Sequence, residues 1–336
     1  MITRRVAVIG AGSWGTALAN LLATRGHPTI VWSYEPEVAE SIRSEHRNRA
    51  YLTEVDLDPR LRATTSIEEA VRAAEVVVSV SPSHVVRQVM TAAAPGLAPD
   101  AMVVSASKGI EVETLRMMDG VLTDVLPPAI AERTAFLSGP SFALEVARRF
   151  PTAVTMASRN PEIAEAAREL FQTEFFRVYT TTDVTGVELG GSLKNVIAIA
   201  AGVVIGMGYG HNTLSALITR GLAEITRLAV VLGADPMTLA GLAGVGDLIL
   251  TCTGALSRNR AVGVALGQGR TLDEIIAEMT MVAEGIRTTR SANELALRHR
   301  VEMPIVAEIH ALLFEGRSPR DAVEALMMRE PKPERD

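Results

Sequence analysis

A glycine-rich turn near the N-terminus constrains the fold of this chain more than any other feature. Residues 5–9 form a short apolar run, and the next six residues, Gly10-Ala-Gly-Ser-Trp-Gly15, match the pattern G-x-G-x-x-G. A helical pattern over 16–25 ends at Gly26, and residues 29–32 predict a second strand. In this context the glycines let the backbone approach a pyrophosphate, and the helix N-terminus offers it free N–H groups. We therefore predict a dinucleotide site here; the alternative is a tight turn that binds nothing.

Strands and helices continue to alternate up to residue 181, which is typical of a doubly wound α/β sheet of the Rossmann type. Further strands are predicted at 75–80, 102–107, 134–138, 152–156 and 177–181. In such sheets ligands bind beyond the carboxyl ends of the strands. Loops rich in glycine, serine or lysine follow three of these ends, at 81–83, 108–109 and 139–141. We expect them to form one wall of a site, although Lys108 alone could be a solvated loop lysine.

After Asp183 the strand signals stop, and helical patterns follow one another to about residue 326. Helices are predicted from 186 onward, at 212–232, 285–298, 304–314 and 318–326, and after a capping box at Thr271-Leu-Asp-Glu274. We therefore predict three parts, which are a dinucleotide-binding domain over 1–185, an all-α domain over 186–328 and a disordered tail over 329–336. The cleft between two domains is a favoured place for a small-molecule site.

The stretch 186–202 predicts a long buried helix that carries a lysine in apolar surroundings. Over 187–209 the only charged side chains are Glu188 and Lys194. Burial lowers the pKa of a lysine, which makes Lys194 a candidate proton donor or acceptor. The pair Gly190-Gly191 predicts that another segment approaches the helix backbone closely, one turn earlier. The alternative is a core helix whose lysine extends to water.

Two stretches of the second half suggest further binding groups. Residues 243–248 place one acid, Asp247, in a glycine-rich turn between helices, where a turn or capping role is the alternative. The sequence Ser257-Arg258-Asn259 comes just before a helix, and an arginine at a helix N-terminus suits a phosphate. The alternative there is an ordinary N-cap with Arg258 on the surface.

Composition argues against several other classes of protein. The chain has 336 residues and a formal net charge of -6, which disfavours a nucleic-acid partner. Cys252 is the only cysteine, and the six histidines lack metal-ligand spacing, so we predict no disulfide and no metal site. The apolar part of the N-terminus is too short for a signal peptide, and the run 196–205 is shorter than a membrane span requires. We expect a cytoplasmic protein with no membrane span.

Ten short blocks, from Gly10 to about Pro304, carry more specific information. They read GAGSWGTALA, VSPSHV, SKGIE, SGPSFALE, GGSLKNVIAIAAG, NTLSALITRGLAE, AGVGDLILTCTG, SRNRAVG, VAEGIRT and VEMPI. Together they resemble the NAD(P)-dependent glycerol-3-phosphate dehydrogenases of the bacterial type. The resemblance implies reduction of dihydroxyacetone phosphate to sn-glycerol 3-phosphate for phospholipid synthesis, with NAD or NADP as cofactor. It also implies a Rossmann domain, a helical domain that binds substrate, and a homodimer.

The resemblance also implies a role for individual residues, with Lys194 as the proton donor or acceptor. The implied substrate set is Lys108, Gly139, Ser141, Lys194, Asp247, Ser257, Arg258 and Asn259. The cofactor set joins the glycines of the turn, Gly10, Gly12 and Gly15, to Ser13, Trp14, Tyr34, Lys108, Ala143, Arg258, Val282 and Glu284. Departures from the family pattern are Ile205 and Leu214, where Asp and Arg are often seen, and Tyr51-Leu-Thr53, which lacks a proline.

The implied chemistry is hydride transfer from the nicotinamide to the carbonyl carbon of the substrate. Lys194 is then placed to donate a proton to the carbonyl oxygen, where charge develops. Asp247 and Asn195 are expected to hold the Lys194 ammonium in position. Arg258 and Asn259 are expected to bind the phosphate and so to orient the reacting carbon.

The residues after the second strand predict the cofactor preference. A site selective for NAD carries Asp or Glu there, bonded to the ribose 2′-hydroxyl. This chain has the uncharged Ser33 and Tyr34 before Glu35, so we predict that NADPH is accepted at least as efficiently as NADH. Ser33 could bond to a 2′-phosphate and Tyr34 could stack on the adenine. A nearby arginine could fold back as a cation, from among Arg43, Arg47 and Arg49; against this, Glu35 could act as the ribose acid.

Two other interpretations stay open at this point. One is another β-hydroxyacid dehydrogenase of the same architecture, which would also carry a lysine on the connecting helix; the phosphate-type site at 257–259 argues against it. The other is a non-catalytic dinucleotide sensor, which would not need Lys194, Lys108 and Asp247.

Overall fold

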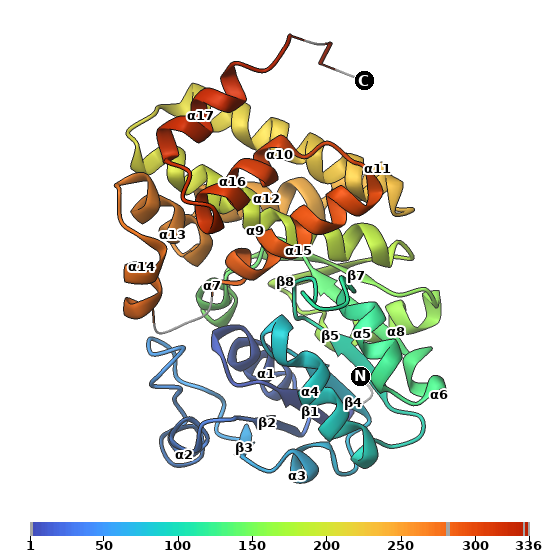
Figure 1. Cartoon of the computed structure of the whole chain (residues 1–336). Coiled ribbons are helices and arrows are strands. Elements are labelled where there is room, and N and C mark those ends of the chain that lie inside the picture. The colour runs from blue at the N-terminus through green and yellow to red at the C-terminus, as the bar shows by residue number, and fades with distance from the viewer. Residues whose placement is uncertain (1–2, 280–282, 332, 335–336) are drawn as a thin grey trace.

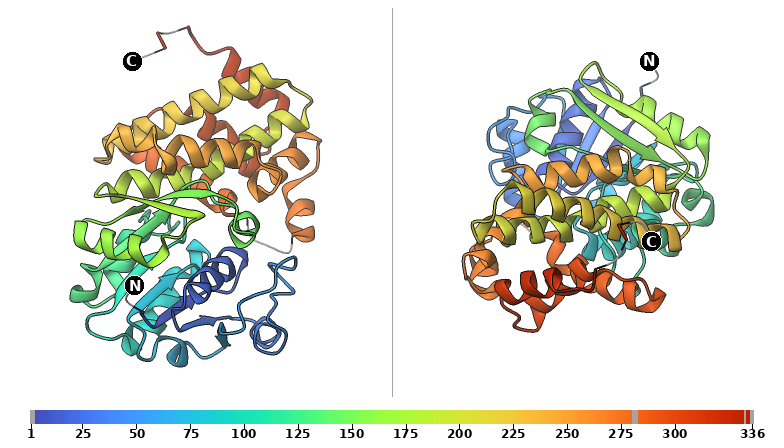
Figure 2. Two further views of the ribbon diagram at one scale, coloured as in Figure 1. Left: turned by 180° about the vertical axis from the view of Figure 1, so that it is seen from behind. Right: turned by 90° about the horizontal axis from the view of Figure 1, so that it is seen from above.

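The computed structural model describes residues 3–279, 283–331 and 333–334, and it consists of a sheet layer and a helical layer (Figure 1). The first half of the chain, coloured blue to green, forms the sheet layer, and the yellow-to-red half forms the helical layer. Seen from behind, the helices lie over one end of the sheet layer (Figure 2). The predicted fold class, a Rossmann-type sheet followed by an all-α half, is confirmed.

Eight strands form one sheet in the order β3-β2-β1-β4-β5-β6-β7-β8. They are β1 Val6–Ile9, β2 Thr29–Trp32, β3 Arg62–Thr64, β4 Val76–Ser79, β5 Met102–Ser105, β6 Thr134–Ser138, β7 Thr152–Ala157 and β8 Phe176–Thr181. The strands β1 to β6 are parallel and have the strand order of dinucleotide-binding sheets. β7 runs antiparallel to β6 and parallel to β8, a reversal that the sequence did not predict. Because β1 to β6 end at one edge, the loops that follow them lie there together.

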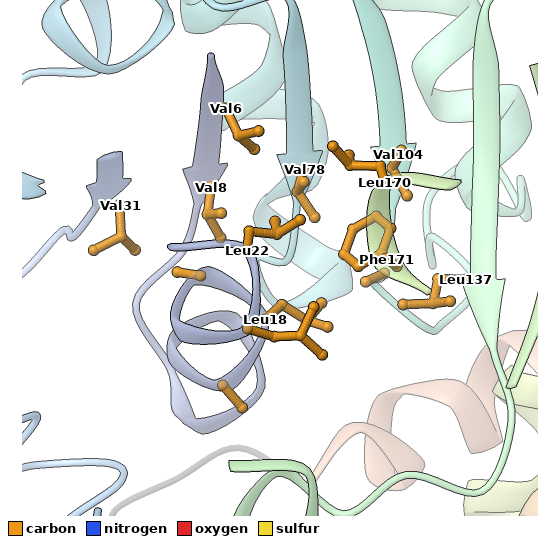
Figure 3. Close-up of a cluster of buried hydrophobic side chains, with 14 of the residues drawn as sticks. Val6, Val8, Leu18, Leu22, Val31, Val78, Val104, Leu137, Leu170 and Phe171 are labelled. Carbon is orange, nitrogen blue, oxygen red and sulfur yellow. The ribbon is translucent and has the colours of Figure 1, made fainter. Parts of the chain in front are cut away.

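Helices cover both faces of the sheet because successive side chains of each strand point to opposite faces. Val6 and Val8 of β1 belong to the core under α1, α2 and α8, which Figure 3 shows with Leu22 beside Val8 and with Phe171 farther along the sheet near Leu137. Ala7 and Ile9 belong to the opposite core, under α3 to α6. These helices are α1 Ser13–Thr24, α2 Pro36–Glu45, α3 Ile67–Val71, α4 Ser83–Ala93 with the 3-10 turn η1 Ala94–Gly96, α5 Met118–Val125, α6 Pro128–Ala131, α7 Ala143–Ala147 and α8 Pro161–Phe171.

Several elements of the sheet layer were not predicted from the sequence. α2 is a polar helix, and β3 has only three residues, so neither produces a clear apolar pattern. α5 was also missed. A capping box at Ser66, the N-cap of α3, is half formed. The Ser66 hydroxyl accepts the backbone N–H of Glu69, but the Glu69 carboxylate binds the hydroxyl of Thr64 instead of the Ser66 backbone.

The helical layer is built around the long helix α9. Its members are α9 Val184–Gly206, α10 His211–Val231, α11 Pro236–Leu239, the π-helical turn η2 Leu242–Gly246, α12 Asp247–Thr253, α13 Arg258–Gly267, α14 Leu272–Glu278, α15 Glu284–His299, α16 Pro304–Phe314 and α17 Pro319–Met327. Helices α10, α12, α13 and α15 all pack against α9. The capping box predicted at Thr271 is confirmed, with Glu274 as its second member.

Glycines let α9 and α13 cross at close range. Gly202 and Gly206 on α9 face Gly263 and Gly267 on α13, and a Cβ on Gly263 would lie 2.0 Å from the carbonyl oxygen of Ile199. A larger residue would therefore push the two helices apart. The contact matters for the site because α13 begins at Arg258, within the stretch predicted to bind phosphate.

Two segments are long and apolar enough to cross a membrane by length and composition alone, 184–206 and 236–253. The first segment includes the run 196–205 and extends beyond it at both ends. The length of that run alone therefore underestimated the apolar segment. In the protein, 89% of its most apolar window is buried, against 39% for the second segment. For α9, burial in the protein core accounts for the apolar composition.

Glu224 on α10 caps α16 with a buried carboxyl group. Its oxygens accept the backbone N–H groups of Ile305 at 2.8 Å and Val306 at 3.3 Å, and burial raises its pKa from 4.5 to about 7. The folded chain therefore holds this proton more tightly than the unfolded chain. The stability that it contributes is complete below the unfolded pKa and is lost as the pH rises through the folded pKa.

We expect Glu224→Gln to remove this pH dependence. The wild type should lose about 1–3 kcal/mol of stability relative to the variant between about pH 5 and about pH 8. Calorimetric melting of both proteins across this range measures the difference. A difference that stays constant with pH would mean that Glu224 does not titrate there.

Candidate active site

Three charged residues from distant parts of the chain meet at the carboxyl edge of the sheet. Lys108 follows β5, Lys194 lies in α9, and Asp247 is the first residue of α12. The Lys108 ammonium donates to Asp247 Oδ2 at 2.7 Å, and the Lys194 ammonium donates to the other carboxylate oxygen, Oδ1. One carboxylate thus holds two ammonium groups side by side.

The surroundings shift the pKa values of Lys194 and Asp247. The exposed fractions of the side chains are 10% for Lys194, 19% for Lys108 and 2% for Asp247. Burial lowers the pKa of Lys194 to about 8, and the Lys108 charge adds to this effect, although Asp247 opposes it. Burial alone would raise the pKa of Asp247, but the two ammonium groups hold it below its usual range. Lys194 therefore does not extend to water, and Lys108 is not a solvated loop lysine.

The glycines before Lys194 allow this convergence. A Cβ on Gly190 would lie 2.5 Å from the carbonyl oxygen of Ala243, so the turn that leads to Asp247 rests directly on α9. A Cβ on Gly191 would lie 2.6 Å from Ser138 Oγ and 3.5 Å from Lys108 Cδ. The close approach that was predicted for these glycines is confirmed. A side chain at Gly190 would push Asp247 away from Lys194, and a side chain at Gly191 would push Lys108 away from it.

The loop after β6 also reaches this region. Gly139 has a φ of +137°, which favours glycine, and a Cβ there would lie 2.9 Å from the Cα atom of Val154. The Ser141 hydroxyl donates to the carbonyl oxygen of Gly139 at 3.0 Å, and Pro140 lies beside Gly246, which precedes Asp247. Gly139 and Ser141 are thus next to the turn that supplies the central carboxylate.

The stretch 257–259 combines a helix cap with a buried amide pair. Ser257 is the N-cap of α13, and its hydroxyl accepts the backbone N–H of Arg260. Arg258 remains exposed, yet the protein atoms around its guanidinium desolvate it and lower its pKa, while Glu284 raises it. The guanidinium is thus partly desolvated at the start of α13 and is influenced by the charge of Glu284.

Asn195 does not hold Lys194, which corrects one expectation from the sequence. Its amide oxygen accepts a hydrogen bond from Asn259 Nδ2 at 2.9 Å, and Asn259 Oδ1 accepts the backbone N–H of Gly285 at 2.9 Å. Because 3.6 residues make a turn, Asn195 points away from its neighbour on the helix. The amide pair instead joins α9, α13 and the start of α15.

The glycine turn at residues 10–15 has the shape that a dinucleotide site needs. Gly10 has a φ of +121°, and a Cβ on Gly15 would lie 1.9 Å from the carbonyl oxygen of Gly10. A Cβ on Gly12 would meet nothing within 4 Å, so the backbone at the start of α1 is open to a ligand. Ser13 donates its hydroxyl to the carbonyl oxygen of Tyr51 at 2.6 Å, and Trp14 packs half-buried against the sheet core. These residues fit the pyrophosphate of NAD or NADP.

The segment after β2 presents an acid rather than free cations. Tyr34 is 81% exposed, while Ser33 is buried and donates its hydroxyl to Glu35 Oε2 at 3.2 Å. Tyr51 donates to the other oxygen of Glu35 at 3.0 Å. The three arginines from which one was expected to fold back are each paired with an acid, in Arg43–Glu40, Arg47–Asp56 and Arg49–Glu45.

A contact between the two layers was not predicted from sequence. Glu284, the first residue of α15, accepts both the backbone N–H of Ser83 at 3.1 Å and its hydroxyl at 2.6 Å. The serine of the loop at 81–83 was a signal for a site wall, but nothing in sequence linked it to Glu284. Ala143 lies half-buried at the start of α7, and Val282 lies outside the described residues.

No group of three or more His, Cys, Asp or Glu side chains that could hold a metal occurs in residues 3–279, 283–331 and 333–334. A cavity of about 430 Å³ lies between α1, α7 and residues 172–175, but none of the predicted site residues lines it. The ionisable groups that could take part in a reaction, Lys108, Lys194 and Asp247, lie together around Lys194 instead. The backbone contacts at Gly190 and Gly191 are found at the same place.

Comparison with known proteins agrees with this geometry. The glycerol-3-phosphate dehydrogenase (NAD(P)+) of Citrifermentans bemidjiense is 54% identical over 333 residues, 99% of each chain. Family models for the N-terminus and C-terminus of NAD-dependent glycerol-3-phosphate dehydrogenase match residues 5–164 and 183–324. The chain belongs to the NAD-dependent glycerol-3-phosphate dehydrogenase family.

Other members of this glycerol-3-phosphate dehydrogenase family are similar along their whole length. The enzyme of Geobacter sulfurreducens is 54% identical over 334 residues, covering 99% of this chain and 100% of its own. The crystal structure of glycerol-3-phosphate dehydrogenase from Coxiella burnetii has a TM-score of 0.92 at 38% identity, covering 97% of this chain and 99% of that one. Two departures from the family pattern, Ile205 and Leu214, lie half-buried near the end of α9 and the start of α10.

Proposed function

We propose that this chain reduces dihydroxyacetone phosphate to sn-glycerol 3-phosphate with NADH or NADPH, for glycerophospholipid synthesis. The observation that carries the proposal is the buried group of Lys108, Lys194 and Asp247, at the sheet edge where dinucleotides bind in this fold. Family membership supports the same reaction, because the relatives are named glycerol-3-phosphate dehydrogenase (NAD(P)+).

The residues of this chain suit that reaction. A bound nicotinamide cofactor supplies the hydride. Lys194, with a pKa of about 8, is protonated at neutral pH and donates a proton to the oxygen that becomes the product hydroxyl. Asp247 orients this ammonium, and Lys108 adds a second positive charge beside the developing alkoxide. No metal ion is needed for these steps.

The substrate phosphate is assigned to the start of α13. The guanidinium of Arg258 and the N-terminal backbone of the helix provide donors for a dianion. Ser257 and Asn259 help chiefly by fixing this turn, through the cap and the amide pair with Asn195. Gly139 and Ser141 are assigned to the opposite wall. Glu284 and the half-buried Trp14 and Ala143 are assigned to the cofactor.

The direct test mixes the purified protein with dihydroxyacetone phosphate and NADH or NADPH, and follows the loss of nicotinamide absorbance. The proposal is supported if NADH or NADPH is oxidised only when dihydroxyacetone phosphate is present and sn-glycerol 3-phosphate is formed. Activity only with 2-keto acids would favour another β-hydroxyacid dehydrogenase. Cofactor binding without turnover would favour a dinucleotide sensor.

We predict that Arg258→Ala weakens the reduction of dihydroxyacetone phosphate strongly, by about 100-fold in kcat/KM, because a charge-assisted contact to the phosphate is lost. Dihydroxyacetone lacks the phosphate and should change by less than about threefold. Steady-state kinetics with both substrates measures the two effects. Equal losses would assign Arg258 to the cofactor or to the fold.

We predict that NADPH is used at least as efficiently as NADH, because Tyr34 is open and uncharged. Glu35 is the group that opposes this, and its hydrogen bonds to Ser33 and Tyr51 place it beside the end of β2. The ratio of kcat/KM for the two cofactors, measured at one pH and salt concentration, decides the question. A preference for NADH of about tenfold or more would contradict the prediction and identify Glu35 as the ribose acid.

The remaining assignments concern organisation and location. We assign residues 1–185 to the cofactor domain and 186–328 to the substrate and dimer domain, supported by one hydrophobic core confined to the first range and another drawn mostly from the second. Of the charged tail that was predicted to be disordered, residues 332 and 335–336 lie outside those described, Arg329 binds Glu302, and the carbonyl oxygen of Glu334 accepts a hydrogen bond from Arg220. Exposed apolar side chains on and after α10, at Val230, Val231 and Met237, support a homodimer, which light scattering would test. We also propose a cytoplasmic location, with no membrane span and no nucleic-acid partner. The formal net charge of -6 supports the absence of a nucleic-acid partner, and the burial of α9 supports the absence of a membrane span.

A further inference from the structure

The second charged residue of α9, Glu188, takes no part in the chemistry described so far. It is buried six residues before Lys194, and its Oε1 accepts the backbone N–H of Asp119 at 3.0 Å, in the first turn of α5. Its Oε2 is also buried and has no hydrogen-bond partner among the described residues. Burial, reinforced by the Asp119 carboxylate, raises the pKa of Glu188 well above its usual range. These surroundings favour the protonated carboxyl group, which is able to donate a hydrogen bond.

A small cavity lies beside this carboxyl group. It has a volume of about 10 Å³ and lies between α9 and the ends of β5 and β6. Ser105 Oγ and Ser138 Oγ are buried without a partner among the described residues, and both residues line the cavity with Glu188. A cavity of roughly this size holds one water molecule, which needs about two to four polar partners. Glu188, Ser105 and Ser138 supply three.

The cavity adjoins the ammonium pair. Lys108 lines it, and the Lys108 ammonium binds Asp247. Gly191 also lines it, and a Cβ on this residue would lie 2.6 Å from Ser138 Oγ. Because Gly191 has no side chain, Lys108 and the Ser138 hydroxyl can lie next to each other. Lys108 in turn influences Lys194 directly, because its charge lowers the pKa of Lys194.

We propose that Glu188, through one water bound in this cavity, supplies the proton that restores Lys194 after each reduction. The inference rests on the proposed function, because it concerns recovery of the same proton donor. Glu188 acts through Lys108 and does not contact the substrate, so it is a positioning and proton-supplying residue. The other charged groups near its carboxyl are Asp119 on α5 and Arg159, whose guanidinium binds Asp119.

The proton transfers balance without any change in oxidation state. Lys194 is left as a neutral amine when it protonates the substrate oxygen. One proton then passes from the Lys108 ammonium to Lys194, beside the Asp247 carboxylate that both contact. Lys108 takes a proton from the bound water, the water takes the carboxyl proton of Glu188, and the Glu188 carboxylate regains a proton from solvent. One solvent proton is consumed in each turnover.

Glu188→Gln tests the relay, because the amide keeps the shape and the cap of α5 but carries no transferable proton. With enzyme in excess over substrate, the first turnover uses the proton already on Lys194, so its rate should stay within about twofold of wild type. Steady-state kcat for dihydroxyacetone phosphate should fall about tenfold, with KM changed by less than about twofold. Glu224→Gln, which alters the other buried glutamate that caps a helix, should change neither rate.

Ser138→Ala removes one partner of the water and leaves Glu188 in place. It should slow steady-state turnover in the same way, and it keeps the test valid if Glu188→Gln folds poorly. Equal losses in the single-turnover and steady-state rates would show that Glu188 only supports the position of Lys108, and would overturn the proposal. Unchanged steady-state rates in both variants would also overturn it. Failure of the wild type to reduce dihydroxyacetone phosphate would instead overturn the proposed function.

Discussion

Lys194→Ala is expected to lower kcat for the reduction of dihydroxyacetone phosphate by about 10²–10⁴-fold, the usual contribution of a positioned acid or base. The fold and cofactor binding should persist, because Asp247 remains paired with Lys108 at 2.7 Å. In the wild type, kcat should decline as the pH rises through about 8, where burial places the pKa of Lys194 and the donor loses its proton. The variant should not show this decline. Steady-state kinetics over pH, with cofactor titration by fluorescence, measures both properties.

The chain offers a matched control for this prediction. Its only lysines are Lys108, Lys194 and Lys332, so Lys332→Ala removes the one lysine to which no role is assigned. This control should keep the wild-type rate and pH profile. A loss of less than about tenfold for Lys194→Ala, with an unshifted profile, would transfer the donor role to Lys108.

Asp247→Asn is expected to disable the site while leaving both lysines in place. The carboxylate attracts both ammonium groups, whereas burial and the charge of Lys108 lower the pKa of Lys194. Without the anion, the pKa of Lys194 should fall below about 8, so that less of the donor is protonated at neutral pH. We expect kcat at neutral pH to fall on the order of 10²-fold, with partial recovery at lower pH. Loss of one partner from a buried ion pair should also reduce the unfolding free energy by about 3–5 kcal/mol.

The pH profile of kcat and a denaturant titration test the two parts of this prediction. Asp235→Asn is the matched control, because Asp235 is an exposed helix cap whose hydrogen bond to Met237 an asparagine can keep. It should change neither activity nor its pH profile. A wild-type profile in Asp247→Asn would mean that the carboxylate does not set the acidity of Lys194.

Some site residues were identifiable from the sequence because their local patterns are unusual. A lysine within a long apolar helix and a glycine turn between a strand and a helix are each costly unless they have a purpose. A further signal was available in the composition. Arginine accounts for all but three of the 33 basic residues, and two of the three lysines meet in the site. An amine can release a proton near neutral pH when buried, which a guanidinium cannot.

Other features depended on contacts between distant segments. The role of Asn195 was predicted wrongly because its sequence neighbour is Lys194, whereas its amide binds Asn259 on another helix. The contact of Ser83 with Glu284 joins residues 201 positions apart, and no local pattern encodes such a pair. The reversed direction of β7 and β8 could not be predicted either, because an apolar run does not indicate whether its strand pairs parallel or antiparallel with its neighbour.

The sequence by itself determined the alternation of strands and helices in the first half, the all-helical second half, the glycine turn and the place of Lys194 on the central helix. These follow from periodicity, backbone freedom and the cost of burying charge, which act within a few residues. Only the tertiary structure decided that one carboxylate, Asp247, binds both Lys108 and Lys194, and that Glu188 faces a cavity beside them. Those outcomes depend on how closely α9 approaches the sheet edge and the turn before α12. That approach is set by packing among segments far apart in the chain.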